Sequence, residues 1–182
     1  KLVIASGAVP KELPSSKGIG NAFVLRQPAD ANAIRQAANN ADSVVIIGGG
    51  YIGLEVAASL RKKGMEITVI EAGERILARV ASKPLANYLN KLHQDNGVTV
   101  ITNVGVEGIN QESGIFASVT LSDGRVVSGD MLITGIGVYP DSQLALEAGL
   151  ETQFETGGAI LVNNEMRTSD KDIFAIGDVA LR

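Results

Sequence analysis

The sequence predicts an α/β fold in which a parallel sheet carries an inserted antiparallel β-meander. Two runs rich in β-branched residues, at 43–47 and 66–70, lack polar–apolar alternation, which is typical of strands buried on both faces. A helical pattern separates these runs, so residues 43–70 indicate one βαβ unit. Several short extended segments with turn signals follow later in the chain and indicate the meander.

The residues before this unit predict a short strand, a long loop and a short helix. Residues 2–5 form an apolar run, and residues 10–29 contain three prolines, as loops and linkers often do. Asp30 is expected to cap an Ala-rich helix over residues 31–38.

Two longer helices are expected. The first begins at Tyr51 and ends with three basic residues before Gly64, which suits the helix dipole and the C′ position. Its apolar face contains Ile52, Val56, Ala57 and Leu60. The second covers residues 82–96, and its apolar residues at helical spacing are Leu85, Tyr88, Leu89 and Leu92.

The remaining elements are short strands. Extended segments of the meander are expected at 104–109, 115–121 and 125–128, with a hairpin turn over 122–125. Further strands are expected at 98–101, 130–134, 159–162 and 173–176. The run at 130–134 is apolar, which predicts another buried strand.

The composition is that of a globular protein and excludes several function classes. The chain has 182 residues, which is enough for one domain with a hydrophobic core. A net charge of −4 and an aromatic content of 4% argue against nucleic-acid binding and against attachment to a membrane surface. There is no cysteine, which excludes disulfide, thiolate–zinc and iron–sulfur sites within this chain and fits a cytoplasmic location.

Targeting segments are not expected. No apolar run approaches the roughly 20 residues of a membrane-spanning helix, and the N-terminal residues lack the features of a signal peptide. The chain begins with Lys1, so we expect an interior piece of a longer protein.

The segment Gly48–Gly53 carries the most informative motif. Its sequence, GGGYIG, fits G-x-G-x-x-G, and it lies directly after a predicted strand and at the start of a predicted helix. In this context Gly48 permits a tight turn, Gly50 lets the backbone approach a pyrophosphate, and Gly53 lets helix and strand pack closely. The N–H groups of the helix N-terminus then favour a phosphate. The alternative is a plain glycine turn.

Glu71 ends the second strand of the βαβ unit. It lies 18 residues after Gly53, close to where an acidic residue accepts hydrogen bonds from the adenosine ribose. A carboxylate there also repels a 2′-phosphate, which predicts NAD rather than NADP. Arg75 and Arg79 lie nearby, and solvated surface charges or adenosine contacts would both explain them.

Glu55 and His93 are two further titratable residues. Glu55 follows Gly53 beside residues expected to be packed, so it is either a group near the nicotinamide end or an acid favoured by the helix dipole. His93 is the only histidine, and we expect a structural residue near a helix end. We predict no metal site and no catalytic side chain in this chain.

The sequence resembles the NAD-binding domain of the pyridine nucleotide-disulfide oxidoreductase superfamily. The resemblance is carried by residues 45–57 and 68–72, and by three further motifs at 5–8, 134–140 and 174–178. Together these segments extend over essentially the whole chain. Within the superfamily, residues 75–80 with Pro84-Leu85 and Leu92-His93 are most similar to NADH-dependent ferredoxin reductases.

The resemblance implies a Rossmann-like parallel sheet of the FAD/NAD(P)-binding fold, here a fragment of a larger flavoenzyme. It implies that residues 1–29 are a junction strand and linker from an FAD domain, that 30–162 bind NAD, and that 163–182 return toward the FAD domain. The cofactor-binding residues that it implies, together with those argued above, are Gly48, Gly50, Tyr51, Ile52, Gly53, Glu55, Glu71, Arg79, Gly135, Gly137 and Asp178.

The implied function is hydride transfer from NADH to FAD, followed by transfer of single electrons to a small iron–sulfur ferredoxin. Gly135 and Gly137 would lie on the nicotinamide side, and Asp178 would bind the ribityl chain of the flavin. The fragment alone is expected to be inactive. Two alternatives remain, namely a disulfide reductase or NADH oxidase of the same superfamily, and a non-catalytic nucleotide-binding module.

Overall fold

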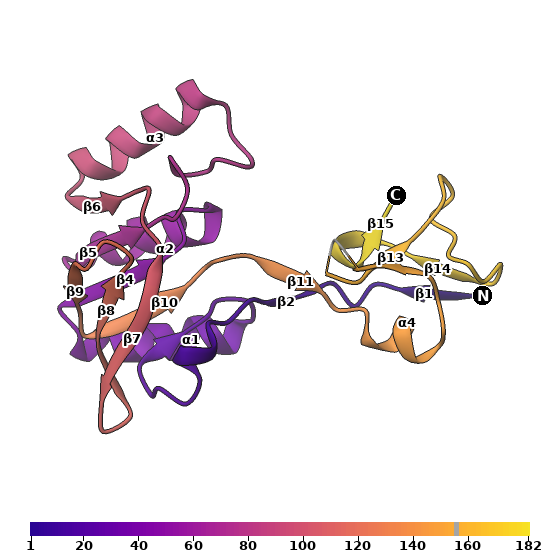
Figure 1. The fold of residues 1–182 in the computed structure, drawn as a ribbon, viewed down its shortest axis with the longest axis horizontal. Helices are drawn as coiled ribbons and strands as arrows, with labels where there is room; N and C mark the ends of the chain where they lie inside the picture. The colour runs from indigo at the N-terminus through magenta and orange to yellow at the C-terminus, as the bar shows by residue number, and fades with distance from the viewer. Residues whose placement is uncertain (155–156) are drawn as a thin grey trace. The chain divides into compact units, whose positions relative to one another are not determined.

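The computed structural model describes residues 1–154 and 157–182, which divide into two compact units (Figure 1). One unit comprises Glu12–Gly137, and the other comprises Lys1–Lys11 with Val138–Arg182. Every helix in the described part of the chain is too short or too polar to span a lipid bilayer.

A five-stranded parallel sheet forms the centre of the unit Glu12–Gly137. Its strand order is β3 (Ala22–Phe23), β10 (Met131–Thr134), β4 (Ser43–Ile47), β5 (Glu66–Ile70) and β6 (Val98–Ile101). The predicted parallel sheet is therefore confirmed. The chain runs from β4 outward to β5 and β6 and returns with β10 on the other side of β4. The strand order thus reverses at β4, and in such sheets ligands bind at the carboxyl ends of the strands at this point.

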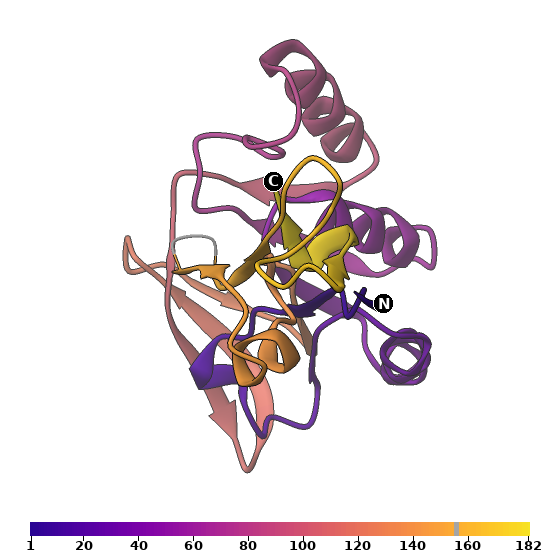
Figure 2. The ribbon, with the colours of Figure 1, turned by 90° about the vertical axis from the view of Figure 1, so that its right-hand side faces the viewer.

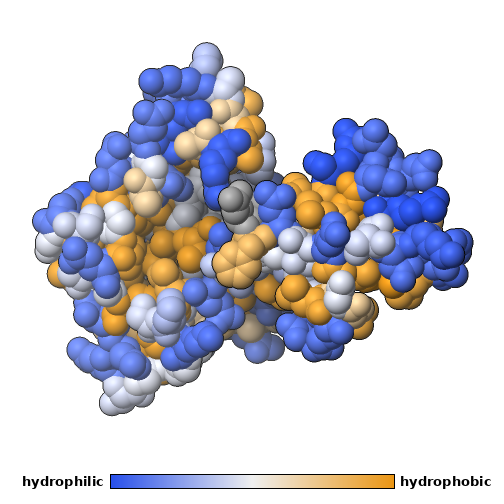
Figure 3. Space-filling model, turned by 45° about the vertical axis from the view of Figure 1, so that its right-hand side comes forward, coloured by the Kyte–Doolittle hydropathy of each residue, from blue (hydrophilic) through white to orange (hydrophobic). Residues whose placement is uncertain are grey.

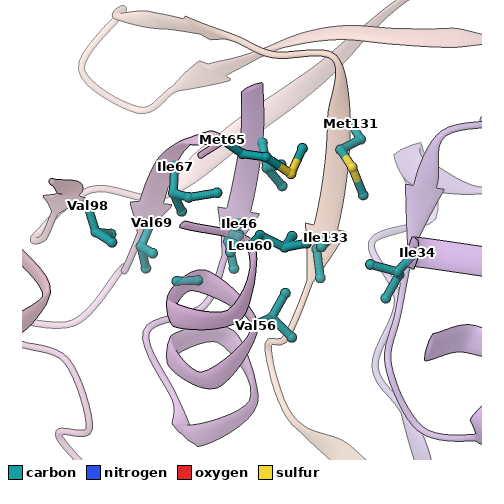
Figure 4. Packing of buried hydrophobic residues seen from close by; sticks show 12 residues of the cluster. Ile34, Ile46, Val56, Leu60, Met65, Ile67, Val69, Val98, Met131 and Ile133 are labelled. Carbon is teal, nitrogen blue, oxygen red and sulfur yellow. The ribbon is translucent and has the colours of Figure 1, made fainter. Parts of the chain in front are cut away.

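Side chains alternate between the two faces of the sheet. Val44 and Ile46 of β4 belong to a hydrophobic cluster with α1 (Pro28–Ala37) and α2 (Tyr51–Arg61), which Figure 4 shows. Val45 and Ile47 belong to a second cluster, on the side of the antiparallel sheet. That sheet consists of β7 (Val106–Glu112), β8 (Ile115–Leu121) and β9 (Val126–Ser128). Figure 2 shows the antiparallel sheet on the face of the parallel sheet opposite to α1 and α2.

The predicted meander is confirmed, but β7 continues three residues beyond the predicted end at 109. Residues 110–112 are polar, so their sequence gives no strand signal, yet they pair with β8 through the backbone. Ser113 and Gly114, with φ of 52° and 81°, form the tight turn between the two strands. Positive φ at both positions matches the twist of a two-residue hairpin turn.

The predicted start of α2 at Tyr51 is confirmed, whereas the start of α1 and the packed face of α2 need correction. α1 begins at Pro28, and Asp30 is not its N-cap but lies in the first turn, where its carboxylate accepts the N–H groups of Arg26 and Gln27 at 2.9 and 2.8 Å. Ile52, predicted on the packed face of α2, is 42% exposed. Leu54 is buried instead, because the loop containing Ile76 and Leu77 covers that side of the helix.

The predicted helix α3 (Lys83–Asp95) is confirmed, but three of its four apolar residues at helical spacing are exposed. Leu85, Tyr88 and Leu92 are 48%, 65% and 44% exposed, whereas Ala86 is buried. The helix contacts the rest of its unit through the neighbouring stripe that contains Ala86 and Leu89. Other hydrophobic residues are exposed as well, and Figure 3 shows orange hydrophobic residues on the face that it draws.

In its described residues, the second unit contains short strands and one short α-helix. β1 (Leu2–Ile4) pairs in parallel with β14 (Ile173–Ala175), and β2 (Ala8–Pro10) pairs antiparallel with β11 (Val138–Pro140). The other elements are α4 (Gln143–Glu147), β12 (Thr152–Gln153), β13 (Ala159–Leu161) and β15 (Ala180–Leu181). The 3₁₀ turn η4 (Gly177–Val179) also belongs to this unit, whereas η1 (Pro14–Ser16) and η2 (Ala38–Asn40) belong to the unit Glu12–Gly137.

The compact units do not coincide with the domain boundaries predicted at residues 30 and 162. Residues 12–29 belong with the parallel sheet because β3 pairs with β10. Residues 138–162 belong with the other unit because β11 pairs with β2 and β13 pairs with β15. The predicted assignment of the outer segments to an FAD domain stays a prediction.

Asp130, directly before β10, forms hydrogen bonds with residues at the start of β4. Its Oδ2 atom accepts the hydroxyl and N–H of Ser43, both at 2.8 Å, and the N–H of Asp42 at 3.0 Å. The hydrogen bond from the Ser43 hydroxyl, helped by the two N–H groups, holds the pKa of Asp130 below its ordinary value. This stabilisation is therefore present above the unfolded-state pKa of about 4 and is lost as the pH falls through the folded-state pKa.

Replacing Asp130 with asparagine is expected to lower the free energy of unfolding by about 1 kcal/mol at pH 7, because charged acceptors form stronger hydrogen bonds. It should also reduce the loss of stability below about pH 4. Urea denaturation at several pH values measures both effects. Asp42→Asn is the matched control, since that exposed carboxylate makes no side-chain hydrogen bond within the described residues. Equal effects of the two substitutions would contradict the prediction.

Candidate dinucleotide-binding site

The glycine-rich turn between β4 and α2 lies at the carboxyl edge of the parallel sheet. Gly48 has a φ of 110°, and a Cβ atom there would lie 2.7 Å from the carbonyl carbon of Gly135. A Cβ atom on Gly53 would overlap the carbonyl oxygen of Gly48. The tight turn predicted at Gly48 and the close packing predicted at Gly53 are therefore present, and neither position has room for a side chain.

Gly50 differs from these glycines because nothing lies within 4 Å of the position that its Cβ would occupy. Its φ of −81° is ordinary for any residue, and it is the N-cap of α2, where no side chain caps the helix. The first N–H groups of a helix have no acceptor within the helix. The exposed side chains of Tyr51 and Ile52 belong to this same first turn. The start of α2 therefore offers backbone donors beside an open surface, which suits an anion.

Gly49 is a crowded position of the turn that the motif did not single out. Its N–H donates to Oε2 of Glu71 at 2.7 Å, and its carbonyl accepts the N–H of Leu77 at 2.9 Å. A Cβ atom on Gly49 would lie 2.9 Å from Cγ2 of Ile76 and 3.1 Å from Cβ of Glu71. The pattern G-x-G-x-x-G treats this position as variable, so only the three-dimensional contacts reveal that glycine is required here.

Glu71 lies beside this turn, directly after β5. Its Oε1 accepts the N–H of Gly73 at 2.7 Å, and its Oε2 accepts the N–H of Gly49. Both carboxylate oxygens therefore have a fixed direction. The structure places Glu71 next to the glycine turn, as the spacing predicted, while its contact with a ribose stays a prediction.

The two arginines after Glu71 occupy different environments. The side chain of Arg75 is only 18% exposed, and its guanidinium donates to backbone carbonyls of residues 76, 77 and 78. Of the two alternatives for Arg75, the solvated surface charge is therefore wrong, and the contact with the adenosine is not tested. Arg79 is exposed, and its proposed contact with the adenosine stays a prediction.

Glu55 is exposed on α2, beside the buried Val56 and Ala57, and both interpretations of this carboxylate stay predictions. It lies on the solvent side of the helix, one residue after the buried Leu54. Partial burial lowers the pKa of His93, which favours its neutral form. Among the described residues, no group of three or more His, Asp or Glu side chains is arranged to hold a metal ion.

The turn after β10 completes the carboxyl edge of the sheet. The N–H of Gly135 donates to the carbonyl of Ile47 at 2.7 Å, and a Cβ on Gly135 would lie 3.6 Å from the nitrogen of Gly53. Gly137, with a φ of 113°, ends this unit. Asp178 lies in the other unit, exposed within the 3₁₀ turn η4. The structure thus brings together the glycines of two turns and Glu71 within one unit.

This arrangement agrees with comparisons to known proteins. The family model for pyridine nucleotide-disulphide oxidoreductases matches residues 1–182. The chain belongs to this family. Among curated members, it is 42% identical over 183 residues to the probable ferredoxin reductase CtmF of Castellaniella defragrans, covering 100% of this chain and 44% of that protein. It is 38% identical over 180 residues to rhodocoxin reductase of Rhodococcus erythropolis, covering 98% of this chain and 41% of that protein.

Solved structures of family members superpose closely. The ferredoxin reductase for the CYP199A2 system from Rhodopseudomonas palustris has a TM-score of 0.94 at 35% identity, covering 99% of this chain and 44% of that one. The covalent complex of putidaredoxin reductase with putidaredoxin gives a TM-score of 0.91 at 36% identity, covering 99% and 44%. The chain therefore spans less than half the length of these relatives. The recognition of the superfamily from sequence motifs is confirmed.

Proposed function

We propose that this chain is the NADH-binding part of an FAD-dependent oxidoreductase that passes hydride from NADH to the flavin and electrons to an iron–sulfur ferredoxin. The observation that carries the proposal is the glycine turn Gly48–Gly53, open at Gly50 and flanked by a Glu71 carboxylate of fixed orientation. The named relatives are ferredoxin reductases, and this supports the choice of acceptor.

The residues of the turn fit the phosphates of a dinucleotide. The N–H groups at the start of α2 would donate to the pyrophosphate, and the absence of a side chain at Gly50 leaves room for it. Glu71 would accept hydrogen bonds from the adenosine ribose through the lone pairs that Gly49 and Gly73 do not use. The same negative charge would repel a 2′-phosphate, so NADH is preferred.

Gly135 and Gly137 would keep the nicotinamide side of the site free of side chains. Arg79 would contact the adenosine, and Glu55 would lie toward the nicotinamide end. In the longer protein, Asp178 would hold the ribityl chain of FAD. When bound, the two cofactors supply the hydride chemistry itself, and the protein orients them. The cytoplasmic location predicted from the sequence stays a prediction.

The full-length protein tests this proposal in steady-state assays that combine NADH or NADPH with a 2Fe–2S ferredoxin or a panel of disulfides. We expect ferredoxin reduction with NADH. We also expect about a 100-fold preference for NADH over NADPH, because repulsion between the Glu71 carboxylate and the 2′-phosphate costs a few kcal/mol. Rapid disulfide reduction without ferredoxin reduction would contradict the proposed acceptor. Equal or tighter use of NADPH would contradict the role of Glu71.

A further inference from the structure

We propose that Arg75 is a positioning residue of the dinucleotide site, because its guanidinium fixes the loop that holds the carbonyl of Gly49. This inference rests on the proposed function and adds a determinant of affinity that does not touch the nucleotide. The loop comprises residues 72–81 between β5 and α3 and is called the Arg75 loop below.

The guanidinium of Arg75 folds back onto its own loop. Nη1 donates to the carbonyls of Ile76 and Leu77 at 3.4 and 3.3 Å, and Nη2 donates to the carbonyl of Ala78 at 3.0 Å. Nε lies 3.6 Å from the carboxylate of Glu74, an ion pair that is too long to count as a hydrogen bond. Three successive carbonyls thus converge on one planar cation, an arrangement that a single ammonium cannot reproduce.

The loop held in this way has an unusual backbone at Leu77. Its φ is 53°, in the left-handed region that a bulky side chain rarely adopts, so surrounding contacts must maintain it. Arg75 holds the carbonyl of Leu77, and that same carbonyl accepts the N–H groups of Val80 and Ala81 at 3.1 and 3.0 Å. The side chains of Ile76 and Leu77 are 1% and 3% exposed and pack against Leu54.

This conformation aims the N–H of Leu77 at the glycine turn, where it donates to the carbonyl of Gly49 at 2.9 Å. The opposite side of the Gly49 residue is held by Glu71, which accepts its N–H. Both backbone polar groups of Gly49 are therefore hydrogen-bonded, the N–H to Glu71 and the carbonyl to Leu77. A turn fixed before the ligand arrives loses less conformational freedom on binding, and affinity rises accordingly.

Arg75 and Glu71 should therefore have different effects on nucleotide choice. Among the described residues, all three hydrogen bonds of the Arg75 guanidinium go to its own loop, and its side chain is only 18% exposed. It supports a turn used by NADH and NADPH alike. Glu71 instead carries the charge that separates the two nucleotides.

The experiment compares Arg75→Met with Arg61→Met in the purified full-length protein. Arg61 is a matched control at the far end of α2, where its guanidinium donates to the carbonyls of Asn96 and Met65 at 2.9 and 3.0 Å. Calorimetric titration measures the Kd for NADH and for NADPH, and thermal unfolding measures Tm. We expect Arg75→Met to weaken both nucleotides by the same factor, roughly tenfold, as misplacement of a binding group does. Arg61→Met should lower Tm without changing either Kd.

Three results would overturn the inference. The first is an unchanged Kd in Arg75→Met, and the second is a larger loss of NADPH than of NADH affinity, which would indicate direct contact with the 2′-phosphate. The third is a wild-type chain that binds neither nucleotide, which would overturn the proposed function as well. If Arg75→Met does not fold, Arg75→Lys keeps the charge and the apolar stem and serves in the same comparison.

Discussion

Replacing Gly53 with alanine is expected to abolish dinucleotide binding and to lower the free energy of unfolding by about 3 kcal/mol, the scale of severe overpacking. The added Cβ would overlap the carbonyl oxygen of Gly48 and lie 3.3 Å from Cγ2 of Ile46. The obstacle is backbone, so no side-chain rotation relieves it. The first turn of α2 would have to move away from β4, which would displace the N–H groups that we propose bind the pyrophosphate.

Thermal unfolding and titration with NADH measure the two effects of Gly53→Ala. Gly108→Ala is the control, because nothing lies within 4 Å of a Cβ at that position in β7 and its φ is not in the left-handed region. We expect this control to change stability by less than about 1 kcal/mol. A Gly53→Ala variant with wild-type Tm and affinity would show that the turn adapts, and the packing argument would then be wrong.

Local patterns in the sequence identified the parallel sheet and most of the candidate site. β4 and β5 are continuous β-branched runs, and the glycine turn follows the first of them directly. The spacing from Gly53 to Glu71 placed the carboxylate at the same edge of the sheet. These features are local, because a strand, a turn and a helix each leave a short-range signal.

The contacts of Gly49 and Arg75 could not be predicted in this way. Gly49 requires glycine because Ile76 and Glu71, which lie more than 20 residues away, leave no space for a Cβ. Arg75 acts on backbone carbonyls, which have the same chemistry in every residue and therefore leave no sequence signal. Periodicity also cannot say which apolar stripe of a helix meets the core, and in α3 the stripe with Ala86 does so.

A substitution at Gly50 is expected to affect dinucleotide binding but not the fold. Gly50→Ala is expected to keep the fold, with a loss of at most about 1 kcal/mol for alanine at an N-cap position. Nothing lies within 4 Å of the added Cβ, and the φ of −81° suits alanine. If the pyrophosphate approaches the backbone here, the methyl group occupies that space, and affinity for NADH should fall by roughly 10- to 100-fold.

The pairing of this variant with Gly53→Ala makes the test selective. Loss of NADH affinity at wild-type Tm in Gly50→Ala has no explanation in the packing of the free protein, because no neighbouring atom contacts the new methyl group. NADPH affinity should fall by the same factor, since both nucleotides share the pyrophosphate, and the ratio set by Glu71 should persist. Unchanged affinity for both nucleotides would mean that the phosphates lie away from Gly50, and the binding mode at the start of α2 would have to be abandoned.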